Sequence, residues 1–141
     1  MLSGLHKHYT MDHGREQEGV RIEFPANGDG SIPTFIIARM GPMNQRYTKT
    51  LERVTYPYKR QLELRTLPNE KAEALMRQVF VNSILLGWEN VQNEGGTAIV
   101  FSAENALTLF QQLPDVYYEL QEKAQDAALF RVEENQGAAK N

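Results

Sequence analysis

The stretch from Val20 to Arg39 reads VRIEFPANGDGSIPTFIIAR, and it predicts two strands joined by a turn. Val20–Phe24 alternates apolar and charged residues, which is typical of a strand with one buried face. Pro25–Ser31 is dense in residues that favour turns. Thr34–Arg39 is rich in β-branched and aromatic residues, which favour strands. We therefore expect an antiparallel hairpin over residues 19–39.

A long helix is expected after the hairpin. Past Gly41-Pro42, apolar residues recur every three or four positions over about residues 44–66, which predicts an amphipathic helix. Asn44 is expected to cap its start. Pro57 lies inside the pattern and removes a helical donor, so we expect a kink or a break near Thr55–Tyr56.

Three further helices are expected at about residues 70–86, 103–112 and 114–130. The second half of the first of these, Val81–Leu86, is apolar nearly all round, so we expect this helix to be the central buried one. Gly87 is expected to end it, because glycine accepts the left-handed conformation that often closes a helix.

The chain as a whole has the size and composition of one domain. It has 141 residues, of which 41% are hydrophobic and 23% charged, as in an ordinary globular domain. Residues 1–17 are polar without periodicity and are interpreted as a flexible arm, or as one that a partner takes up. We expect a single globular domain over residues 18–131 and a flexible tail over residues 132–141. The expected fold is α+β and predominantly helical, with the hairpin packed on a bundle of four to five helices.

The composition also argues against several classes of function. The chain has no cysteine, which excludes disulfides, thiolate metal sites and cysteine nucleophiles and suits a reducing compartment. Its net charge of −3 gives no general electrostatic case for binding nucleic acid. The N-terminus lacks the apolar core of a signal peptide. No stretch approaches the roughly 20 apolar residues of a membrane span.

Two clusters have the residue types of a metal site. His6, His8, Asp12 and His13 include ligand types that zinc prefers. Nothing nearby offers a rigid scaffold for them, which favours histidines carried incidentally on the arm. Asn27–Gly30 resembles a fragment of a calcium loop, but the closing position that needs a carboxylate holds an alanine, which favours a plain hairpin turn.

No catalytic group is expected. Ser102 is followed by no histidine and lies in no Gly-x-Ser-x-Gly motif, so it is interpreted as the cap of the helix after it. Four carboxylates fall on the polar faces of the expected helices, where no perturbed pKa is indicated. They are Glu52, Glu63, Asp115 and Glu119. We expect no catalytic, cofactor-binding or metal-binding residue, and hence no enzyme.

Charge is distributed unevenly along the chain. Arg39 to Arg65 contains seven basic and two acidic residues, whereas Asp115 to Glu134 contains six acidic and two basic residues. One interpretation is two helices of opposite charge that pack together or are simply solvated. The other is self-association, or two surfaces that match the charges of partners.

Six short motifs stand in order along the chain from about Gly19 to Arg131. They are Gly19–Ile22, Ile37–Gly41 leading through Asn44 into a basic helix, Gly87–Val91, Phe101–Ala106, Leu113–Tyr117, and an Ala-rich run that ends in Phe130-Arg131. This order resembles a tail assembly chaperone family of long-tailed bacteriophages. Met40–Met43 departs from the small, Ala/Gly-rich turn expected there, and the N-terminal arm is longer than expected.

The resemblance implies a chaperone in the host cytoplasm that binds the tape measure protein and helps recruit tail tube subunits, with no nucleic acid, membrane or cofactor involved. A helical domain can offer a groove to an amphipathic helix. The residues we expect to line it are Tyr47, Leu51, Tyr58, Leu109, Phe110 and Tyr118. The alternative is a small structural component of the phage tail or neck.

Overall fold

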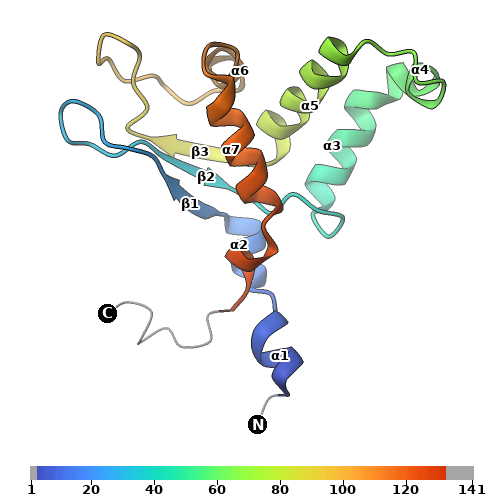
Figure 1. Ribbon diagram of the computed structural model, residues 1–141, viewed down its shortest axis with the longest axis horizontal. Helices are drawn as coiled ribbons and strands as arrows, with labels where there is room; N and C mark the ends of the chain where they lie inside the picture. Colours follow the sequence, from blue (N-terminus) through green and yellow to red (C-terminus); the bar gives the residue numbers. More distant parts are fainter. Residues whose placement is uncertain (1–2, 133–141) are drawn as a thin grey trace.

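The computed structural model describes residues 3–132, which form an antiparallel sheet of three strands packed against helices (Figure 1). The elements are α1 (Gly4–Tyr9), α2 (His13–Glu18), β1 (Val20–Glu23), β2 (Thr34–Ile37), α3 (Gln45–Thr55), η1 (Tyr56–Tyr58), α4 (Lys59–Glu63), α5 (Asn69–Ser83), β3 (Leu85–Glu89), α6 (Ala103–Gln112), α7 (Pro114–Gln125) and η2 (Ala127–Phe130). The fold is α+β and mostly helical, as the sequence predicts.

The hairpin is confirmed. β1 pairs antiparallel with β2, with Val20 opposite Ile37 and Glu23 opposite Thr34. The turn between them is held by the Asp29 carboxylate, which accepts hydrogen bonds from the backbone N–H and the hydroxyl of Ser31. These bonds lower the pKa of Asp29, because they favour its charged form. The glycine-rich segment therefore serves as a turn.

The third strand corrects the sequence analysis, which extended a helix to residue 86 and ended it at Gly87. α5 ends at Ser83, and β3 begins two residues later and pairs with β2 on the side away from β1. Gly87 lies within this strand, opposite Ile36. The apolar run from Val81 has no period, so it suits a buried strand as well as a buried helix. Pairing with β2 decides in favour of the strand.

The kink in the first long helix is confirmed. α3 ends at Thr55, a 3₁₀ turn carries Pro57, and α4 follows as a short separate helix. The Asn44 side chain caps α3 by accepting a hydrogen bond from the backbone N–H of Tyr47 at 3.0 Å. α3 packs along α5, and this helical pair extends away from the sheet (Figure 1).

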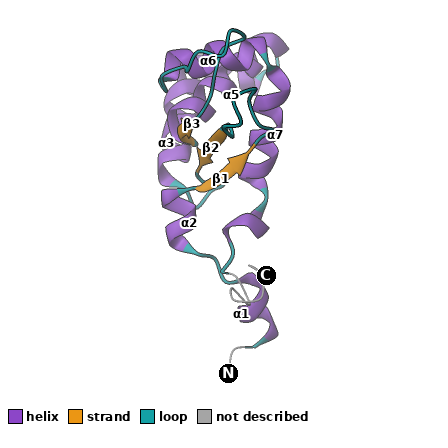
Figure 2. Cartoon of the chain, turned by 90° about the vertical axis from the view of Figure 1, so that its left-hand side faces the viewer, coloured by secondary structure: helices purple, strands orange, loops and turns teal. Residues whose placement is uncertain are grey.

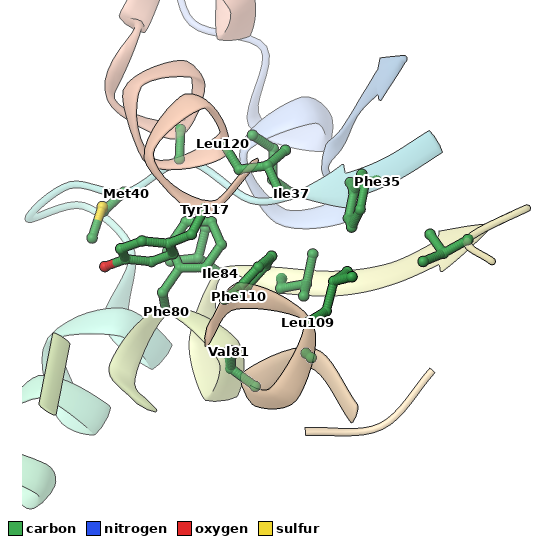
Figure 3. Close-up of a cluster of buried hydrophobic side chains, with 14 residues drawn as sticks. Phe35, Ile37, Met40, Phe80, Val81, Ile84, Leu109, Phe110, Tyr117 and Leu120 are labelled. Carbon is green, nitrogen blue, oxygen red and sulfur yellow. The ribbon is translucent and has the colours of Figure 1, made fainter. Parts of the chain in front are cut away.

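The core lies between the sheet and helices α5, α6 and α7. Phe35 and Ile37 from β2 point into the same cluster as residues of these three helices (Figure 3). Phe80 of α5 makes edge-to-face contacts with Phe110 of α6 and Tyr117 of α7, at centroid distances of 6.2 and 5.3 Å. Such contacts add to the free energy of burial.

The N-terminal segment forms two short helices, α1 and α2, which lie below the strands in Figure 2. α2 and its capping residue are attached to the domain by several contacts. The backbone N–H of Asp12, just before α2, donates to the carbonyl of Phe130 at 2.7 Å, and Glu16 forms an ion pair with Arg39 at 2.8 Å. The flexibility expected of residues 1–17 stays a prediction. Of the expected tail, residues 133–141 lie outside the described part of the chain.

Gly19 gives a test of the junction between α2 and β1. Its φ is +91°, and an added Cβ would lie 2.9 Å from the carbonyl oxygen of Ile37 and from two side chains. Gly19→Ala should lower the free energy of unfolding by about 2 to 3 kcal/mol, measured by urea denaturation, because backbone strain and crowding add together. Gly30 has a similar φ of +87° in open space, so Gly30→Ala should cost only about 1 kcal/mol. An equal loss of unfolding free energy in the two variants would contradict the crowding around Gly19.

Candidate partner-binding surface

The six residues proposed for a groove do not form one surface. Leu109 and Phe110 belong to the core, with 6% and 1% of their surface exposed, because α6 packs against both α5 and α7. Little of either side chain is available to a partner, and their part in binding stays a prediction. Tyr47, Leu51 and Tyr58 are half-buried along α3, η1 and their packing partners. Of the six, only Tyr118 is classed as exposed.

Tyr118 lies at the rim of a shallow groove between α5 and α7, which we call the α5–α7 groove. The groove has a volume of about 280 Å³. It is lined by Ala72, Glu73 and Met76 of α5 and by Tyr117, Tyr118 and Gln121 of α7. A space of this size accepts one or two side chains of a partner, and not a drug-sized ligand.

The Tyr118 ring is supported by a row of aromatic rings that leads to the core. Tyr117 lies 5.5 Å from Phe110 on one side and 5.5 Å from Tyr118 on the other, measured between ring centroids. Tyr117 is only 3% exposed, whereas Tyr118 is 46% exposed. A surface aromatic that rests on buried rings loses little freedom on binding, and such residues often dominate interfaces.

Burial of Tyr117 also affects its ionisation. Loss of water around the phenol raises its pKa from 10.0 to about 12, although the nearby positive charge of Arg77 acts in the opposite direction. The floor of the α5–α7 groove is therefore a neutral phenol at physiological pH.

Helices α7 and α3 differ in charge. α7 carries Asp115, Glu119 and Glu122, and Glu73 of the groove is 4.0 Å from Arg77. By contrast, Arg46, Lys49 and Arg53 of α3 line a separate depression; we call these three residues the basic stripe. No ion pair joins α3 to α7 within residues 3–132, so the two charged surfaces do not neutralise each other there.

Ser102 and Trp88 have structural roles. Ser102 caps α6 by accepting a hydrogen bond from the backbone N–H of Asn105 at 3.0 Å. Trp88 lies in β3, stacks edge-to-face on Phe35 and Phe101, and donates its indole N–H to the carbonyl of Ile99. In the described part of the chain, no three histidine or acidic side chains gather closely enough to hold a metal ion. Nor is any helix there long and apolar enough to cross a membrane.

The sequence of the chain matches the model of a known protein family. The model of the YdaY prophage protein family matches residues 42–141. The chain belongs to this family. It is therefore a phage-derived protein, which agrees with the phage origin that the sequence resemblance implied. The match covers α3 to α7, and hence the α5–α7 groove and the basic stripe. Comparisons with curated proteins and with solved structures gave no match.

The buried phenol predicts a pH dependence of stability. Because the pKa of Tyr117 is raised on folding, its contribution is fully present below pH 10 and is lost as the pH rises from 10.0 to about 12. Tyr117→Phe removes the ionisable group. The midpoint temperature of thermal unfolding should therefore fall less steeply with pH over that range for this variant than for the wild type. Tyr56→Phe makes the same change at a position that is 70% exposed and serves as the control. Parallel profiles for wild type and Tyr117→Phe would contradict the assignment.

Proposed function

We propose that this prophage protein is a tail assembly chaperone of the host cytoplasm that binds the tape measure protein and helps recruit tail tube subunits during tail morphogenesis. The phage family and the order of sequence motifs support this role. The observation that carries it is the α5–α7 groove, in which an exposed tyrosine is held in place by buried rings.

The groove suits an amphipathic helix better than it suits a flat surface. Tape measure proteins are long and helical, and before the tube encloses them their apolar stripes invite aggregation. One apolar side chain of such a helix fits between Met76 and Tyr118, and the next along its stripe packs on the outer face of α7. The carboxylates of α7 favour a helix with lysine or arginine beside its apolar stripe.

We also propose that the protein is not an enzyme. Among the described residues, the two carboxylates with clearly lowered pKa values serve structure: Asp29 holds the hairpin turn, and Glu89 accepts two hydrogen bonds from Arg21 across the sheet. Both are at the surface, and neither lies in the α5–α7 groove. Their environments support roles in the fold, whereas a carboxylate with a perturbed pKa inside a cleft would have favoured catalysis.

Co-expression with the tape measure protein of the same prophage tests the proposal. We expect the tape measure protein to become soluble and to co-purify with this protein. Tyr118→Asp should reduce the amount recovered by about tenfold or more, because it replaces an aromatic anchor with a charge. Val100→Asp is the matched control, since Val100 is 78% exposed in the loop before α6, and it should leave recovery unchanged.

Two outcomes would overturn the proposal. One is a tape measure protein that stays insoluble and carries none of this chain with it. The other is this protein in stoichiometric amounts in purified virions, detected by mass spectrometry, which would favour a structural component of the tail or neck. Unchanged recovery of the tape measure protein with Tyr118→Asp would place the contact outside the α5–α7 groove.

A further inference from the structure

β1 forms an edge of the sheet. The strand order is β1-β2-β3, so within residues 3–132 no strand pairs with the outer side of β1. In Figure 1, β1 is the lowest strand, with β2 and β3 above it. An edge of this kind presents backbone donors and acceptors that another strand can satisfy.

The hydrogen-bond pattern fixes which residues of β1 point outward. The backbone N–H of Phe24 donates to the carbonyl of Pro33, at the end of the ladder between β1 and β2, at 2.9 Å. In an antiparallel pair, alternate residues direct their backbone groups to the same neighbour. The backbone N–H and C=O groups of Ile22 therefore face β2, as the N–H of Phe24 does. Those of Arg21 and Glu23 face the open side.

The side chains of β1 follow the same order of charged and apolar residues on both sides of Ile22. Val20, Ile22 and Phe24 are partly buried against the core, and Arg21 and Glu23 are exposed on the other face. In both directions from Ile22 the sequence gives a charged residue and then an apolar one, and the two charges are opposite. A strand with this pattern is complementary to an antiparallel copy of itself.

We propose that β1 pairs with β1 of a second copy of this chain, about a two-fold axis at Ile22, to form a continuous sheet of six strands. In this register Arg21 lies opposite Glu23 of the second copy, and both have outward backbone groups, so the two residues can exchange two hydrogen bonds. The two-fold axis repeats this pair. The apolar residues of both copies then lie on the same face of the sheet, with Ile22 beside its counterpart.

The surroundings of β1 define how far the pairing extends. Pro25 has no N–H, so the ladder ends there and the contact is confined to the strand itself. Arg21 lies on the exposed face of the sheet, as Glu23 of the second copy would, and its guanidinium donates to Glu89 of β3 at 2.7 and 2.9 Å across β2. Glu23 makes no ion pair within the described residues. The contact is isologous, so it closes at two copies.

A single cysteine tests the register. The chain has none of its own, so Ile22→Cys can cross-link only to another copy. Directly opposite residues of a non-hydrogen-bonded pair have Cα atoms about 4.5 Å apart, which a disulfide can span. We expect Ile22→Cys to form a covalent dimer under mild oxidation, several-fold faster than Val100→Cys, which places an exposed thiol in the loop between β3 and α6. Equal rates for the two variants would overturn the proposal.

Charge exchange gives a second test that does not depend on the cysteine variant. Glu23→Arg places like charges opposite each other twice in the dimer, so it should weaken association by about tenfold, measured by analytical ultracentrifugation. Arg21→Glu combined with Glu89→Arg should do the same while keeping the intramolecular ion pair reversed. Mixing these two proteins should restore dimers, because each again meets its opposite charge. A wild-type protein that stays monomeric, or a mixture that does not associate, would overturn the proposal. The chaperone role is tested separately, through Tyr118.

Discussion

One fully buried residue, Ile84, holds the two layers of the fold together. α5 ends at Ser83 and β3 begins at Leu85, so Ile84 alone connects the central helix to the sheet. Its carbonyl accepts a hydrogen bond from the backbone N–H of Ala38, just past the end of β2. Because a helix and a strand meet here without a loop, the direction of α5 is set by the sheet, and α3 follows α5 away from it.

Local chemistry made much of the fold predictable. The alternation from Val20 to Phe24 identified the hairpin, and the caps at Asn44 and Ser102 placed the starts of two helices. β3 was missed because an apolar run without a period fits a buried helix and a buried strand equally well. Only the partner decides between them, and that partner, β2, lies almost fifty residues earlier in the chain.

The candidate surface was predictable only in part. Tyr118 was expected to line a groove, and it is exposed, whereas its neighbour Tyr117 faces another way on the helix and is buried. Leu109 and Phe110 share a face that the sequence marks as apolar, but the sequence does not say that α5 and α7 cover it. Met76 was not named because its role depends on the approach of α7 to α5.

Trp88 has a consequence for how the molecule can be observed. It is the chain's single tryptophan, and it lies among the rings of Phe35 and Phe101 in the sheet, whereas Tyr118 belongs to the helical side. Its indole fluorescence therefore reports the environment of β3 alone. Selective excitation of indole would follow melting of the sheet. The six tyrosines all lie in helical segments, so their absorbance would follow events on the helical side. The chain thus carries two intrinsic optical probes, one on each layer.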